Sequence, residues 1–260
     1  MNTQTIDHTA NHLVDYTLHL ADNSLIMGHR LSEWTGHGPS LEQDIAITNI
    51  ALDLIGQARN FYQYAATLSE NKGGLPVTED TLAYLRDGHE FKNLLITELP
   101  NGHWGKSILK IYFFSTWQYF VYQKLIYSSD KQLAAIAEKS LKEVTYHVRW
   151  SSEWVMRLGD GTKESHEKIQ EALDDLWPYT GEMFEAVEWE KSSNVGMDVQ
   201  ILKEDWVKKV SGIIEKATLR LPDGNAWMQT GGKKGIHTEH LGYILTELQF
   251  LQRAYPGCEW

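Results

Sequence analysis

Cysteine is almost absent from this chain of 260 residues, in which Cys258 is the one residue of its kind. A single cysteine cannot form an intramolecular disulfide, so the fold must be stable without one. Such usage is typical of proteins in a reducing compartment, and we predict a cytoplasmic protein. Cys258 also lies close to the C-terminal end, which is a poor position for a catalytic nucleophile.

Basic residues are few compared with acidic ones. The chain has 24 lysines and arginines against 35 aspartates and glutamates, which gives a formal charge of −11. An acidic surface repels phosphate backbones, so we do not expect nucleic acid as a partner.

The sequence also lacks the marks of a signal peptide and of a membrane span. The first ten residues, MNTQTIDHTA, have neither a basic start nor an apolar centre. The most apolar stretch, residues 111–127, is interrupted by the polar residues Ser115, Thr116, Gln118, Gln123 and Lys124. We therefore predict a deeply buried helix at this place and no membrane partner.

No convincing run of alternating apolar and polar residues indicates a β-strand. Apolar residues recur instead at helical spacing, and we predict an all-α fold. Asp130 and Thr162 are the expected N-caps of two helices, and Pro178 should kink or split a third. The predicted helices cover residues 12–33, 41–69, 79–96, 104–128, 131–158, 164–190, 199–219 and 237–254.

No low-complexity linker divides the chain. We therefore predict a flexible tail over residues 1–11 and a single helical domain over residues 12–260. The four longest helices, over 12–33, 41–69, 104–128 and 131–158, should form a four-helix bundle core. The last three helices should add a further layer.

Two helices carry pairs of residues that could bind a metal ion. Glu143 and His147 are four residues apart, as are Asp53 and Gln57, so each pair lies on one helix face. Glu33 is a further carboxylate near the end of the first long helix. Pairs at this spacing are more often ordinary surface pairs than ligands, and the neutral amide of glutamine binds iron poorly.

The segment TGGKKGIHTEHLG, residues 230–242, offers a second candidate site. Lys233 and Lys234 follow two glycines at an expected helix start, where an anion could bind or a partner could dock. His237 and His240 are three residues apart, with Glu239 between them, but a zinc site would need a further ligand. A solvent-exposed loop and helix start is the alternative interpretation.

Three long segments carry a specific resemblance to a known family. They read LDLIGQARNFYQYAATLSE (52–70), LKEVTYHVRWSSEWVMRLGDGT (141–162) and TGGKKGIHTEHLGYILTELQFLQRAYPG (230–257). In order and spacing they resemble the structural subunits of phenylacetyl-CoA epoxidases (1,2-phenylacetyl-CoA monooxygenases), the PaaC family, over nearly the whole chain. The resemblance implies the ferritin-like fold of the di-iron carboxylate proteins.

The resemblance also implies where a di-iron site has been lost. The catalytic subunits are expected to carry D-E-x-G-H where this chain has Asp53–Gln57, and K-E-E-x-x-H where it has Lys142–His147. Two glutamates are thus replaced by Leu54 and Val144. The vestigial ligand positions are Glu33, Leu54, Gln57, Ser115, Val144 and His147. Glu33 and His147 alone keep ligand character, which is too little for two irons, so we expect a packed apolar core and no metal.

By the same resemblance, this chain is a non-catalytic structural subunit. Its expected partners are the catalytic A subunit, which holds the iron, and the other subunits of the epoxidase complex. A reductase subunit with flavin and an iron–sulfur centre would supply electrons from NADPH, and the complex would act in aerobic phenylacetate degradation. No cofactor is expected in this chain.

Two alternatives remain open at the level of sequence. One is an independent di-iron or mono-iron oxygenase that uses Glu33, Asp53, Glu143 and His147. The other is a CoA-binding module in which Lys233 and Lys234 contact the phosphates.

Overall fold

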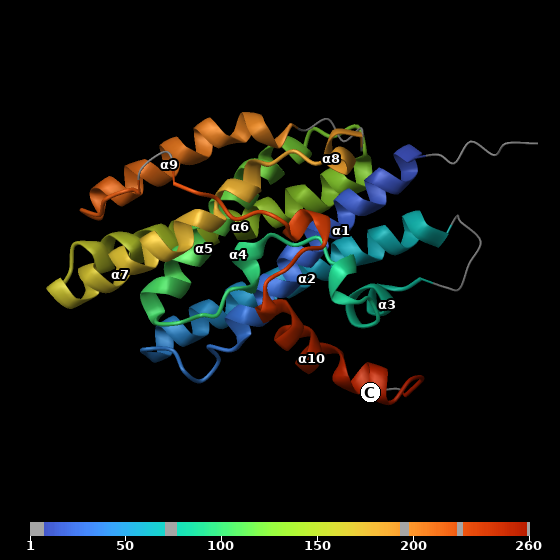
Figure 1. The fold of residues 1–260 in the computed structure, drawn as a ribbon, viewed down its shortest axis with the longest axis horizontal. Helices are drawn as coiled ribbons and strands as arrows, with labels where there is room; N and C mark the ends of the chain where they lie inside the picture. Colours follow the sequence, from blue (N-terminus) through green and yellow to red (C-terminus); the bar gives the residue numbers. More distant parts are fainter. Residues whose placement is uncertain (1–7, 71–76, 193–197, 223–225, 259–260) are drawn as a thin grey trace, which may run out of the picture.

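The computed structural model describes residues 8–70, 77–192, 198–222 and 226–258 (Figure 1). Within these ranges every regular element is helical, which confirms the all-α prediction. None of the helices described there combines the length and apolar character that a bilayer crossing requires. Of the tail predicted over residues 1–11, residues 1–7 lie outside the described ranges, and the first helix begins at His8.

Four long helices form the core of the fold. They are α1 (His8–Ser32), α2 (Leu41–Glu70), α5 (Trp104–Leu125) and α6 (Lys131–Gly159). Short loops join α1 to α2 and α5 to α6, so the helices of each pair run antiparallel, and α2 meets α6 across the bundle (Figure 1). One long crossover joins the two pairs. This is the arrangement of a ferritin-like bundle, as predicted.

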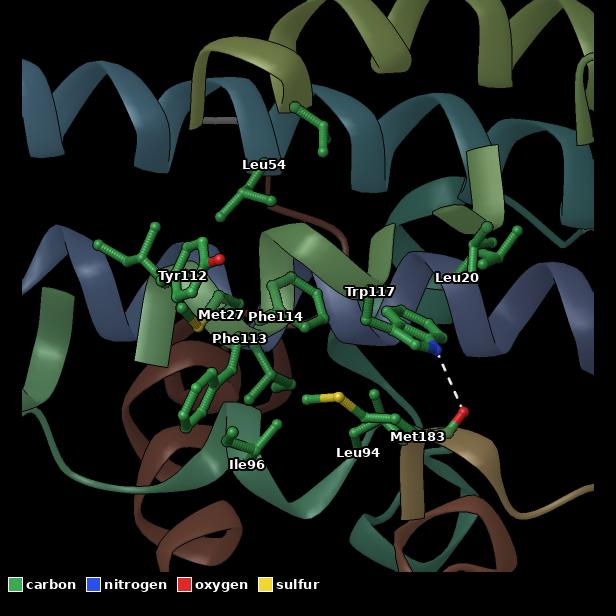
Figure 2. Close-up of a cluster of buried hydrophobic side chains, with 14 of the residues drawn as sticks. Leu20, Met27, Leu54, Leu94, Ile96, Tyr112, Phe113, Phe114, Trp117 and Met183 are labelled. Carbon is green, nitrogen blue, oxygen red and sulfur yellow. Dashed lines mark hydrogen bonds between the residues drawn. The ribbon is translucent and has the colours of Figure 1, made fainter. Parts of the chain in front are cut away.

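The interior of the bundle is apolar and rich in aromatic residues. Leu54 on α2, Met27 on α1 and Phe114 on α5 point toward one another in the close-up (Figure 2). Trp117 is 1% exposed, and its indole N–H donates to the carbonyl of Met183 at 3.1 Å. This bond satisfies the polar atom of a large buried ring and fixes the ring's orientation.

The helix predicted over residues 79–96 is wrong. The crossover contains instead α3 (Glu79–Tyr84), the 3₁₀ turn η1 (Gly88–Glu90) and α4 (Leu95–Glu98). Side chains of α1 take the backbone donors that a continuous helix would need. The N–H of Lys92 donates to Asp22 at 2.8 Å, and the N–H of Leu94 donates to Asn23 at 2.9 Å. Tertiary hydrogen bonds therefore override the local helical pattern.

The remaining helices cover the bundle from outside, as predicted. α7 (Lys163–Leu176) and α9 (Leu202–Lys216) pack on α5 and α6, α8 (Glu188–Ser192) packs on α1, and α10 (Glu239–Ala254) packs on α3 and α4 (Figure 1). The 3₁₀ turns η2 (Trp177–Tyr179), η3 (Gly181–Phe184), η4 (Val199–Ile201) and η5 (Gly232–Lys234) lie between them.

Three local predictions are confirmed at helix ends. The Asp130 side chain accepts from the N–H of Leu133 and caps α6, and the Thr162 side chain accepts from the N–H of Ser165 and caps α7. The helix predicted over 164–190 is split at Pro178, because α7 ends at Leu176 and η2 follows.

Candidate functional site

Five of the six vestigial ligand positions lie inside the bundle. Leu54 and Gln57 on α2 are each 1% exposed, as is Ser115 on α5, while Val144 and His147 on α6 are fully buried. Leu54 and Val144 fill their positions with packed apolar side chains, as expected. A polar cluster, however, lies directly beside them.

Gln57 is the centre of this cluster. Its amide nitrogen donates to Glu143 Oε2 at 2.9 Å. Its amide oxygen accepts from the hydroxyl of Tyr122 at 3.2 Å and from the amide of Gln118 at 3.4 Å. Gln118 also reaches the hydroxyl of Ser24 on α1 at 3.5 Å. Gln57 and Gln118 together therefore connect α1, α2, α5 and α6 through hydrogen bonds between side chains.

His147 belongs to the same cluster. Its Nε2 lies 3.0 Å from Asp53 Oδ2, which joins α6 to α2. In the part of the chain that the structure describes, Nδ1 of His147 is buried and has no hydrogen-bond partner. The histidine thus makes one strong polar contact, to a carboxylate at the bundle surface.

Glu33 does not join this cluster. It follows the end of α1, its side chain is 47% exposed, and it pairs with Arg30 at 2.7 Å. The α1 residue that faces Leu54 is Gly28, since a Cβ placed on Gly28 would lie 3.3 Å from Leu54 Cβ. Glu33 therefore lies apart from the other five predicted ligand positions, at the surface of the bundle. Sequence order alone does not specify the level at which two helices cross, so it could not place Glu33 relative to Leu54.

Glu143 is a carboxylate of this cluster, and its hydrogen bond from Gln57 offsets only part of the effect of its burial. Burial raises the pKa of Glu143, while the hydrogen bond from Gln57 lowers it and the nearby charge of Asp53 raises it again. Burial also raises the pKa of Tyr122, so this phenol stays protonated and acts as a donor.

The residues present do not fit a di-iron group. Such a site needs a glutamate from each of two helices and Glu-x-x-His from each of two others. Here the matching positions hold leucine, glutamine, valine and histidine, and Gly28 faces them from α1. Within the described ranges, no group of three or more histidine, cysteine, aspartate or glutamate side chains has the geometry to hold a metal ion. Asp53 and His147 do meet, as hydrogen-bond partners, while Glu143 is bonded to Gln57.

Three members of the cluster were not recognised from the sequence: Ser24, Gln118 and Tyr122. Gln118 and Tyr122 are four residues apart in the most apolar helix, so a polar pair on one face of a buried helix was the available signal. Ser24 carried no such signal.

The C-terminal candidate segment is part of the core architecture. Lys233 is 1% exposed, and its ammonium lies 2.9 Å from Glu190 Oε1 and 2.9 Å from the carbonyl oxygen of Glu185. This ammonium already has acceptors and is closed to solvent, so it is not open to an incoming anion. Lys234 is half exposed and pairs with the Glu185 side chain.

His237 is anchored in the same way. Its Nδ1 contacts Glu98 Oε1 at 2.5 Å, and its Nε2 lies 2.9 Å from the carbonyl oxygen of Phe91. Burial lowers the pKa of His237, but the hydrogen bond and charge of Glu98 outweigh burial and raise the pKa overall. Glu239 is exposed and His240 half-buried in the first turn of α10. The histidines are thus not arranged as a zinc site.

Fold and site together define a ferritin-like helical bundle whose centre holds the buried apolar residues Leu54 and Val144 beside a polar cluster around Gln57. The chain belongs to the phenylacetic acid catabolic protein family, whose sequence profile matches residues 1–260. It is 47% identical over 253 residues to the C component of the 1,2-phenylacetyl-CoA epoxidase of Escherichia coli (strain K12). The matched region covers 96% of this chain and 100% of that relative.

Proposed function

We propose that this chain is a non-catalytic structural subunit of a phenylacetyl-CoA epoxidase, which stabilises a catalytic di-iron subunit. The observation that supports this most directly is the identity of two residues buried at the centre of the bundle. Leu54 and Val144, 1% and 0% exposed, stand where a di-iron protein needs two glutamates.

The replacement is physically coherent. Carboxylates buried at both positions without a metal would repel each other and cost several kcal/mol each through lost hydration. Leucine and valine fill the same space with apolar contacts, and Gln57 occupies its position without a charge. The bundle thus retains its shape and loses the means to hold iron.

The cofactors of the reaction then belong to other chains. In this proposal iron is held by the catalytic A subunit, and flavin, an iron–sulfur centre and NADPH belong to a reductase subunit. This chain binds none of them. It is a single helical domain that acts in the cytoplasm, where its partners would be the A subunit and the other epoxidase subunits.

Co-expression tests the proposal. The catalytic subunit should be poorly soluble or inactive alone and should become soluble and active with this chain. The variant His147→Gln removes the one histidine of the candidate ligand set with little change in side-chain volume. We expect its complex to epoxidise phenylacetyl-CoA within about two-fold of the wild-type rate. Full activity of the catalytic subunit alone would contradict the structural role.

An independent oxygenase is the rival function, and iron analysis of the purified chain separates the two. We expect iron well below one atom per chain. Stoichiometric iron that is lost in His147→Ala would overturn the proposal, as would a large fall in activity of the His147→Gln variant in an intact complex. A CoA-binding role is disfavoured by the buried Lys233 and is tested by calorimetry of CoA against this chain alone.

A further inference from the structure

One side of α2 carries apolar residues that no described part of the chain covers. Leu41, Ile45 and Leu52 are 71%, 53% and 61% exposed. With Gly56 they form what we call the α2 ridge, a line of residues spaced by four and seven positions along the outward side of the helix. This spacing is that of the seam between two packed helices, so the shape of the ridge suits a helical partner.

Gly56 has no role that the described part of the chain explains. Glycine weakens a helix interior relative to alanine. A Cβ at Gly56 would meet no atom within 4 Å, so nothing around it in the structure requires the smaller residue. Its position beside Leu52 would allow the backbone of a partner helix to approach α2 closely.

The charges around the ridge indicate the chemistry of the partner. Beside the α2 ridge, at the junction of α2 and α6, lie Asp53, whose side chain is 36% exposed, and the half-buried Glu143. Their side chains are bonded to His147 and Gln57, and Lys139 and His147 on α6 are the groups whose charge lowers the pKa of Glu143. A lysine or arginine of a partner would form an ion pair with these two carboxylates, Asp53 and Glu143.

A second copy of this chain fits the α2 ridge poorly. Asp53 directly follows Leu52 on α2. A two-fold symmetric contact centred near Leu52 would bring the Asp53 and Glu143 pairs of both copies close together. Four carboxylates in one interface repel one another, so a different chain is favoured.

We propose that the α2 ridge is the surface on which the catalytic subunit docks one of its long helices, with a basic residue of that helix directed at Asp53 and Glu143. This inference rests on the proposed function, because that function supplies a partner of the same bundle fold. The ridge from Leu41 to Gly56 is about 24 Å long at 1.5 Å per residue. It would form the centre of the contact.

Binding of the purified catalytic subunit to the full-length chain tests this inference. Leu52→Asp places a charge at the centre of the ridge, and we expect affinity to fall by roughly 30-fold or more, as for a central interface residue. Gly56→Leu should raise the melting temperature of the isolated chain and still weaken binding. A residue whose role is only to stabilise the fold would not combine a higher melting temperature with weaker binding.

Matched variants elsewhere supply the controls. Gly212 on α9 is also a helical glycine with open space around it, and Phe250 on α10 is 60% exposed. Gly212→Leu and Phe250→Asp should bind like the wild type. If they lose affinity while the ridge variants keep it, the docking surface is not α2.

Three outcomes are distinguishable. If the wild-type chain does not bind the catalytic subunit at all, the proposed function itself fails. If it binds and the ridge variants bind equally well, this inference alone is overturned. If the isolated chain forms a homodimer and Leu52→Asp dissociates it, the ridge is a self-association surface. That result would also overturn this inference.

Discussion

Lys233 offers the sharpest test of the structure, because the sequence and the fold suggest different roles for it. Its ammonium is buried against Glu190, whose own side chain is 2% exposed, at 2.9 Å. Changing Lys233 to methionine keeps most of the side-chain volume and removes the charge. A carboxylate would then stay buried without its cation.

The expected loss is large. Breaking a buried ion pair by removing one partner costs about 3–5 kcal/mol, because the remaining charge has lost both water and its counter-charge. In a chain of this size each kcal/mol corresponds to about 2–4 °C, so the melting temperature should fall by roughly 6–20 °C. The double variant Lys233→Met, Glu190→Leu should recover most of this loss, since neither charge of this pair remains.

Urea denaturation of the wild type and the two variants, followed by circular dichroism at several pH values, measures these differences in the free energy of unfolding. Burial raises the pKa of Glu190, and the charge of Lys233 opposes the rise. Without that charge the folded variant should hold the Glu190 proton to a still higher pH, whereas the unfolded chain releases it near 4.5. The folded state then binds more protons between these values, so the variant should gain stability relative to the wild type as pH falls.

The opposite pattern would refute this reasoning. If Lys233→Met is as stable as the wild type and loses affinity for CoA, then Lys233 is an exposed anion contact and the buried pair does not exist. If the double variant is no more stable than Lys233→Met, the loss does not arise from an isolated charge on Glu190.

Two further predictions concern the bundle itself. Burial lowers the pKa of Lys110 to about 7, so the unfolded state binds an extra proton above that pH. The stability of the wild type relative to Lys110→Met should therefore rise by roughly 2 kcal/mol from pH 7 to pH 9 in urea titrations, and a flat difference would contradict the burial of this amine. Gly28→Val should destabilise the chain by about 1–3 kcal/mol in the same assay, because a Cβ would lie 3.0 Å from Ile55 Cγ1 and would push α1 from α2. Gly212→Val, at an open position, is its control, and an equal loss there would show that the contact between α1 and α2 is not the cause.

Local patterns were sufficient for much of the fold. The four long helices, the caps Asp130 and Thr162, and the break at Pro178 follow from hydrogen-bond chemistry within a few residues. The predicted helix over 79–96 failed because Asp22 and Asn23, some seventy residues earlier, hold its backbone in an extended form.

The sequence by itself determined that a helical bundle would form, because its apolar residues recur at helical spacing, and the family resemblance predicted that Leu54 and Val144 would be packed in its core, where the structure places them. Only the tertiary structure decided which residues meet there. It placed Gly28, not Glu33, against Leu54, and it turned Lys233 from a candidate anion contact into the partner of Glu190. Contacts between distant segments depend on the level at which helices cross and on which charges are buried together, and neither is encoded in local spacing.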